Sequence, residues 1–182
     1  IGNIDIMRVL SDATNTIARG EILQIVNRNN ISISELQYKK IIYCKTSKLF
    51  EASCDIVNIL KDIKKYKKEV VHNYGLHIGN AFQLSDDILD YTSSSNILGK
   101  NIKNDLIEGR ITLPIIYALN MVNKEEKHFM EEVITEKKYS YLKEICSLIK
   151  QCGAVEKCIA TLIKEATLAK SALLHISESI YK

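Results

Sequence analysis

The sequence predicts an all-α protein, a helical bundle that forms a single domain over residues 1–182. Glycine and proline are rare, with 7 Gly and 1 Pro, so long uninterrupted helices are favoured over a turn-rich β fold. Apolar residues recur at spacings of three and four along most of the chain, and no segment shows the alternation of a strand. The 46% hydrophobic content is ordinary for a globular protein, and the length is sufficient for one sizeable core.

Composition also argues against several classes of function. The net charge of +3 is too small to indicate nucleic-acid binding. No apolar run approaches the roughly 20 residues of a membrane span. The 5 cysteines are odd in number, form no C-x-x-C pair and follow no visible signal peptide. We therefore expect reduced thiols and an intracellular protein, in the cytoplasm or in an organelle such as the mitochondrion.

The first predicted helix runs to about Arg28. Near one side of this helix lie the apolar residues Ile4, Met7, Leu10, Ile17 and Ile25. The chain opens on Ile1, without a methionine and already inside this helical pattern, which suggests a fragment or a chain whose beginning is not shown.

A second helix is predicted to start at Ser34, which has the capping-box spacing to Gln37. Lys45 falls within its apolar row of Ile41, Leu49, Ala52, Ile56 and Ile59. Such a lysine usually extends its ammonium group to water, and spacing alone favours this interpretation. The alternative is that the ammonium group meets an anionic ligand in a cavity.

The third predicted helix, from about Lys67 to Tyr91, carries an unusual acidic cluster. Asp86 and Asp90 are one turn apart, so their carboxylates project from the same face, and Asp87 flanks them. Three acids so close repel one another, and a hard cation such as Mg²⁺ between them would relieve that repulsion and could also bind a phosphate. For the acids alone, a solvated helix end is an equally good interpretation.

The segment after this helix is basic. Leu98 to Arg110 has no clear period, so we expect a loop that could fold over a ligand, with Lys100, Lys103 and Arg110 suited to anionic oxygens. Acids that bind a metal, opposite a basic loop, would form a pocket for a diphosphate. Further helices are predicted at 113–121, with Thr112 as N-cap and Pro114 in the first turn, from Asn123 onward, at 139–151 and at 155–180.

The motif FQLSDDILDY followed by LGKNIKNDLIEGRITLP resembles the second aspartate-rich region of trans-prenyl diphosphate synthases. Two further segments are similar to that family: Tyr43 to Leu49, which reads Y-x-K-T-x-x-L, and Gly20 to Gln24, which reads G-E-x-x-Q. The resemblance runs from Gly20 to the final helix and corresponds to the C-terminal half of a family member. It does not include the first aspartate-rich motif, and Arg110 stands where many members have lysine.

The resemblance implies a prenyltransferase of the isoprenoid synthase fold, whose long-chain polyprenyl branch fits the motif best. An allylic diphosphate would ionise and the carbocation would add isopentenyl diphosphate, in an enzyme that is typically a homodimer. The implied roles are Mg²⁺ binding by Asp86, Asp87 and Asp90, with Asp87 as a ligand or a support. The resemblance also implies that the diphosphate is bound by Lys45, Lys100 and Arg110. For Lys45 this reverses the interpretation from spacing, in which its ammonium group extends to water. The implied catalytic residues are Lys45, Thr46 and Gln83.

Two alternatives remain open. The chain could be a non-catalytic partner subunit, or an inactive fragment that retains a diphosphate site, which the absent first motif favours. The intact second motif favours an enzyme for the parent protein. A terpene cyclase of similar fold is disfavoured by the G-K and E-G-R-I-T-L-P segments.

Overall fold

The computed structural model describes residues 2–61, 65–92, 104–174 and 176, and all regular structure in these ranges is helical, as predicted. Contacts divide the chain into two compact units. The first contains Ile1–Leu23, Lys40–Gln83 and Leu162–Lys182, and the second contains Gln24–Lys39 and Leu84–Thr161. The single domain inferred from the sequence stays a prediction, and each unit is described by itself.

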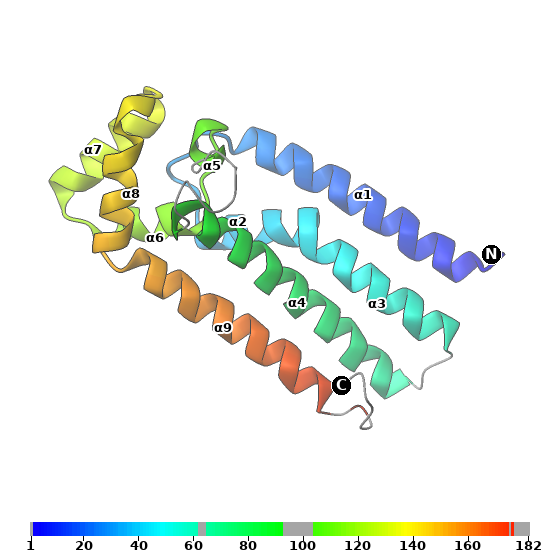
Figure 1. The fold of residues 1–182 in the computed structure, drawn as a ribbon. Helices are drawn as coiled ribbons and strands as arrows, with labels where there is room; N and C mark the ends of the chain where they lie inside the picture. The colour runs from blue at the N-terminus through cyan, green and yellow to red at the C-terminus, as the bar shows by residue number, and fades with distance from the viewer. Residues whose placement is uncertain (1, 62–64, 93–103, 175, 177–182) are drawn as a thin grey trace. The chain divides into compact units, whose positions relative to one another are not determined.

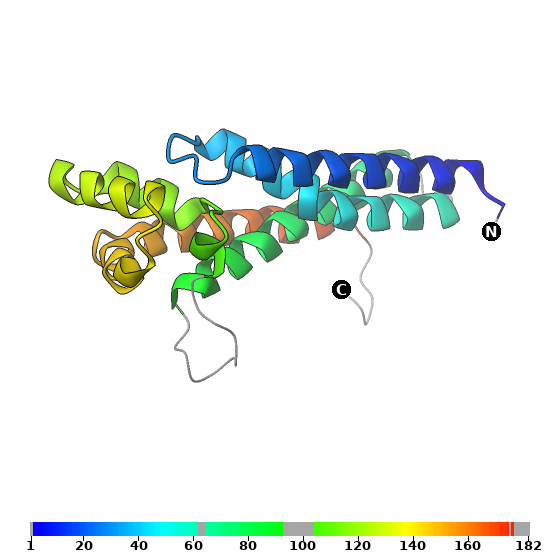
Figure 2. The ribbon, with the colours of Figure 1, turned by 90° about the horizontal axis from the view of Figure 1, so that it is seen from above.

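Most of the first unit consists of long helices: α1 (Ile4–Val26, of which the last three residues belong to the second unit), α3 (Lys48–Leu60), α4 (Lys65–Thr92, up to Gln83) and α9 (Ala154–Leu173, from Leu162). Figures 1 and 2 both show α1 beside α3. Lys48 ties these two helices together, because its ammonium group lies 2.7 Å from Asp12 of α1 and 2.6 Å from the buried carboxylate of Glu51.

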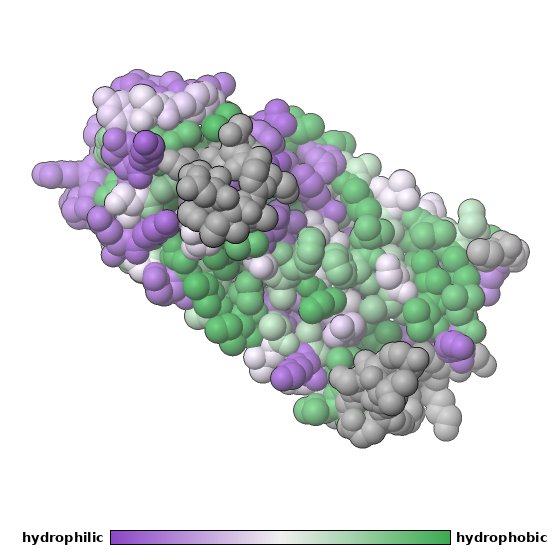
Figure 3. Space-filling model, in the orientation of Figure 1, coloured by the Kyte–Doolittle hydropathy of each residue, from purple (hydrophilic) through white to green (hydrophobic). Residues whose placement is uncertain are grey.

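The apolar side of α1 seen in the sequence is not the side that the helix buries. The helix buries Ile6, Ala13 and Gly20, at a spacing of seven, and leaves Ile4, Met7 and Leu10 exposed. Small residues at positions 13 and 20 allow a close approach of neighbouring backbone, and this contact sets the inward face rather than the larger apolar row. Hydrophobic residues also reach the surface along α3 and α4 of this unit (Figure 3).

The helix predicted from Ser34 onward contains a π-helical turn. It consists of α2 (Glu35–Ile42), the π turn η1 (Tyr43–Ser47) and α3, without a break. Ser34 and Gln37 form the predicted cap, with Gln37 N donating to Ser34 Oγ at 3.2 Å and Ser34 N to Gln37 Oε1 at 2.9 Å. A π turn adds a residue to the helical repeat and rotates the helix face that follows it. In the predicted apolar row, Ala52 is buried, Leu49 is exposed, and Ile41, Ile56 and Ile59 are partly buried.

Two glycines, one on α1 and one on α4, allow these helices to pack closely against η1. A Cβ atom on Gly20 of α1 would lie 2.9 Å from the backbone nitrogen of Lys45. A Cβ atom on Gly79 of α4 would lie 2.6 Å from Cα of Ser47. Both contacts involve backbone, which cannot rotate away as a side chain can. The irregular turn is therefore packed between α1 and α4 at distances that only glycine permits.

The second unit is built around α6 (Leu113–Met121), whose residues 113–119 are all buried. It also contains α5 (Asn104–Ile107), α7 (Lys124–Thr135), the 3₁₀ turn η2 (Tyr139–Tyr141) and α8 (Leu142–Gln151). As predicted, Thr112 precedes α6 and Pro114 lies in its first turn, and Asn123 and Glu126 form a capping box on α7. The segment Leu98–Arg110, predicted as a loop, includes the helical turn α5 in its described part.

None of the helices in the described part of the chain combines the length and apolarity needed to cross a membrane.

We predict that Gly79→Ala destabilises the protein by about 1–3 kcal/mol, because the added methyl group would overlap the backbone of η1 and force the turn to move. Urea unfolding followed by circular dichroism measures this change. Gly2→Ala is the control, since nothing lies within 4 Å of a Cβ atom at that position. Equal stability of the two variants would contradict the close packing of η1.

Candidate functional site at the acidic end of helix α4

The three predicted acids at the end of α4 occupy three different environments. Asp86 is exposed, Asp90 is partly buried and Asp87 is buried. Asp90 Oδ2 accepts a hydrogen bond from the backbone nitrogen of Asp105, at 3.3 Å. Asp86 and Asp90 therefore present carboxylate oxygens one turn apart on an accessible face, which is a suitable set of donors for a hard cation.

Asp87 is held by a buried tyrosine. Tyr38 of α2 donates its hydroxyl to Asp87 Oδ2 at 2.5 Å, and the two residues are only 3% and 4% exposed. Burial, followed by the negative charge of Asp87, raises the pKa of Tyr38 well above its usual value, so the phenol stays protonated as a donor. The contact fits the supporting role suggested for Asp87 better than direct metal ligation. No sequence pattern pointed to Tyr38, which lies 49 residues from Asp87 along the chain.

A fourth acid, Asp105, lies beside these three acids and forms an ion pair with Arg110. Arg110 Nε and Nη2 lie 2.7 Å and 2.6 Å from Asp105 Oδ1, and Arg110 Nη1 lies 2.8 Å from Glu108. Burial raises the pKa of Asp105; Arg110 opposes this shift, and the charges of Asp90 and Asp86 add to it. Arg110, predicted to bind diphosphate, is thus engaged with carboxylates in this structure.

The turn that carries Arg110 depends on glycine. Gly109 has a φ of +74°, and its carbonyl accepts from the backbone nitrogen of Asn29 at 2.8 Å. A Cβ atom at position 109 would lie 2.6 Å from Asn29 Oδ1. The E-G-R sequence therefore needs glycine both for its left-handed backbone and for contact with the loop that precedes α2. Lys100 and Lys103, the other predicted cations of this segment, lie outside the described residues.

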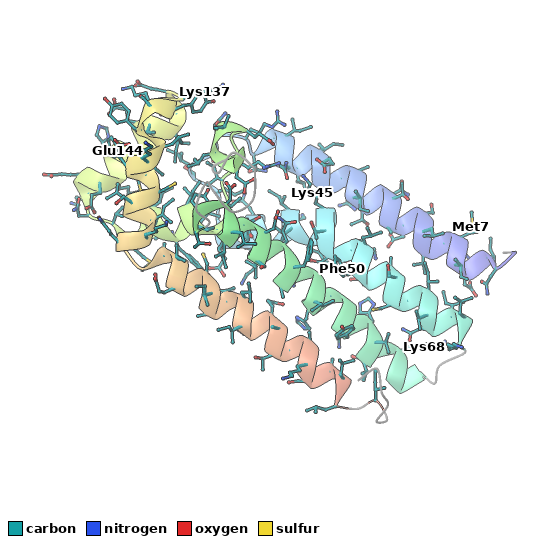
Figure 4. The ribbon with its side chains drawn as sticks, in the orientation of Figure 1. Met7, Lys45, Phe50, Lys68, Lys137 and Glu144 are labelled. Carbon is teal, nitrogen blue, oxygen red and sulfur yellow. The ribbon has the colours of Figure 1, made fainter. Side chains whose placement is uncertain are left out.

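The other predicted site residues belong to the first unit and meet at η1. Thr46 Oγ1 donates to Gln83 Oε1 of α4 at 2.7 Å, so these two residues lie together. Lys45 Nζ lies 3.2 Å from Glu21 Oε1 of α1, and its side chain is 31% exposed. Lys45 is labelled in Figure 4. Glu21 belongs to the G-E-x-x-Q segment, so this motif contacts the lysine directly.

A second group that could hold a metal ion was not predicted from the sequence. Glu51, Asp55 and His72 place one possible ligand atom each within 4.8 Å of one another. Glu51 Oε1 already binds the ammonium group of Lys48 at 2.6 Å, and His72 Nδ1 lies 3.0 Å from Asp55. Lysine and histidine thus already provide these carboxylates with hydrogen-bond partners, and we assign no metal to this group.

Comparison with protein families matches residues 1–151 to the polyprenyl synthetase model. The chain is 36% identical over 174 residues to octaprenyl diphosphate synthase of Escherichia coli, covering 95% of this chain and 54% of that protein. It is 36% identical to an all-trans-nonaprenyl-diphosphate synthase of Rhodobacter capsulatus, covering 100% and 56%. Heptaprenyl diphosphate synthase component 2 of Bacillus subtilis is 32% identical, covering 90% and 46%.

Solved structures give the same result. A decaprenyl diphosphate synthase from Rhodobacter capsulatus superimposes with a TM-score of 0.90 at 30% identity, covering 98% of this chain and 55% of that one. A polyprenyl synthase from Caulobacter crescentus, complexed with calcium and isoprenyl diphosphate, gives 0.91 at 31%, covering 97% and 55%. The chain thus spans about half the length of the relatives that it matches.

We predict that Tyr38→Phe lowers stability by roughly 1.5–3 kcal/mol, because it removes a hydrogen bond to the buried carboxylate of Asp87. Tyr91→Phe is the matched control: Tyr91 is equally buried, but its hydroxyl contacts the neutral Thr112 at 3.3 Å, so its loss should cost about 1 kcal/mol. Urea unfolding of both variants provides the comparison. A smaller loss for Tyr38→Phe than for Tyr91→Phe would mean that the Asp87 contact does not stabilise the site.

Proposed function

Because this chain belongs to the polyprenyl synthetase family, we propose that it forms the C-terminal half of a trans-prenyltransferase. The enzyme would condense an allylic prenyl diphosphate with isopentenyl diphosphate to make a longer, long-chain polyprenyl diphosphate. The observation that carries the proposal is the acidic end of α4, where Asp87 is buried against Tyr38 while Asp86 and Asp90 keep accessible carboxylates. The named products of the similar synthases support the long-chain assignment.

We assign Mg²⁺ binding to Asp86 and Asp90, with Asp87 as a support rather than a ligand. Bound Mg²⁺ would neutralise negative charge on the diphosphate leaving group. The calcium in the Caulobacter crescentus complex supports a divalent cation in the family. On this chain, Tyr38 donates to one oxygen of the buried Asp87, which suits a supporting role, and the backbone of Asp105 would orient Asp90 for the cation.

Cationic side chains would bind the diphosphate. Lys45 has an ion pair with Glu21 whose members are both partly exposed, so a diphosphate can compete for it. For Arg110 the same competition is more costly, because two of its nitrogens contact Asp105, which is more deeply buried. We therefore propose that Lys45 and Lys100 bind substrate directly and that Arg110 chiefly neutralises Asp105.

Thr46 and Gln83 would stabilise the allylic carbocation. Thr46 donates its proton to Gln83, so the remaining lone pairs of the hydroxyl oxygen are available to an adjacent positive charge. The pair thus supplies neutral, negative dipoles to the intermediate.

We further propose a homodimer, as implied by the resemblance to this family. The alternative of a non-catalytic partner subunit has one observation in its favour: the Bacillus subtilis relative is named as a component of its synthase. The molecular size of this protein can be measured alone and again in the presence of other cellular proteins. The comparison distinguishes a self-associated enzyme from one member of a mixed assembly.

We predict that Asp86→Asn abolishes most of the Mg²⁺ dependence of diphosphate binding in the full-length protein, because it removes one of two accessible carboxylates from the cation site. Isothermal titration with inorganic diphosphate, with and without Mg²⁺, measures the effect. Asp5→Asn is the control, since Asp5 is an exposed acid of α1 paired with Arg8. An unchanged Mg²⁺ dependence in Asp86→Asn would refute the metal assignment.

A further inference from the structure

A series of hydrogen bonds between polar side chains connects η1 to helix α9 within the first unit. Ser47 Oγ donates to Asn80 Oδ1 at 2.5 Å, and Asn80 Nδ2 donates to Glu165 Oε2 at 3.1 Å. His77 Nδ1 lies 2.8 Å from the same oxygen of Glu165. No motif predicted these contacts, and no role assigned so far to the site residues uses them.

This series of hydrogen-bonded side chains is largely shielded from water. Ser47 is fully buried, and the side chain of Glu165 is only 15% exposed. Hydrogen bonds in such surroundings are strong and their geometry is restricted, whereas an unsatisfied member would be costly. The position of Glu165 on α9 therefore constrains the groups that it contacts.

Glu165 determines which way the amide of Asn80 points. An ionised carboxylate accepts hydrogen bonds only, so it must face the NH₂ end of the amide. The carbonyl end then faces Ser47, whose hydroxyl donates to the amide oxygen. Without Glu165, the amide could reverse and present its NH₂ group to Ser47 instead.

The contact with Asn80 is one of two parallel links between η1 and α4. Thr46 binds Gln83 and the next residue, Ser47, binds Asn80, three positions earlier on α4. Gly79, adjacent to Asn80, packs against Cα of the same serine. Since a π turn lacks the regular hydrogen bonding of an α-helix, these side-chain links and glycine contacts have a large share in fixing its orientation.

We infer that Glu165 is a positioning residue: through Asn80 and Ser47 it orients the π turn so that the Thr46 hydroxyl points at Gln83. This inference rests on the proposed function, in which Thr46 and Gln83 stabilise the carbocation. Glu165 touches no substrate in this account. Its effect therefore falls on the chemical step rather than on substrate binding.

The test compares Glu165→Met with Glu165→Gln in the full-length protein. The amide oxygen of glutamine can still accept from Asn80, whereas methionine cannot. We expect Glu165→Met to lower kcat roughly tenfold with KM for both substrates within about twofold, and Glu165→Gln to restore most of the activity. Glu156→Met, an exposed glutamate of the same helix, is the control and should leave kcat unchanged.

Two further measurements separate this inference from the proposed function. In a Thr46→Val background, Glu165→Met should cause no additional loss of kcat, because both changes act through the same hydroxyl. Side-chain amide NMR signals of Asn80 and Gln83 should shift in Glu165→Met and not in Glu156→Met, whether or not the protein is active. An additive loss of kcat, or an unmoved Gln83 signal, would overturn the positioning role of Glu165. A Thr46→Val variant with normal kcat and a shifted Gln83 signal would instead refute the catalytic role proposed for Thr46.

Discussion

Electrostatic repulsion among four carboxylates at the acidic end of α4 is the constraint on which the site in the second unit depends. Asp86, Asp87 and Asp90 are neighbours on one helix, and Asp105 lies close enough for Asp90 and Asp86 to raise its pKa further. The protein handles each acid differently: Tyr38 binds Asp87, Arg110 pairs with Asp105, and a backbone amide contacts Asp90. Asp86 is exposed to solvent and Asp90 is partly buried. Asp86 and Asp90 are therefore the acids of this cluster that are best placed to bind a ligand.

In the first unit the main structural constraint is different: the irregular turn η1 must be held in one conformation. A π turn places consecutive residues Lys45, Thr46 and Ser47 toward three different partners, Glu21, Gln83 and Asn80. Glycines on the two flanking helices allow the backbones to approach closely enough to prevent the turn from relaxing. Rigidity of this kind suits groups that must stabilise a short-lived cation, because dipoles that need not reorganise stabilise charge most effectively.

The sequence predicted the helical class, most helix boundaries and the caps, because these follow from local spacing and from capping chemistry. Thr46 and Gln83 were singled out through a family resemblance rather than through spacing. The sequence could not predict the π turn, since its extra residue leaves no local mark. The buried side of α1 does not follow from its larger apolar residues, because the helix buries the small residues Ala13 and Gly20. Tyr38 and Glu165 were missed because their partners are distant in sequence.

We propose that this chain carries one acidic, metal-binding part of a prenyltransferase whose activity needs a second acidic face. The most direct measurement follows labelled isopentenyl diphosphate, with an allylic diphosphate primer and Mg²⁺, in two samples: the 182-residue chain alone and the longer protein that contains it. The account predicts incorporation of label into a long-chain product by the longer protein and none by the short chain. Turnover by the 182-residue chain alone would contradict it, because the acidic end of α4 would then suffice without a second acidic face.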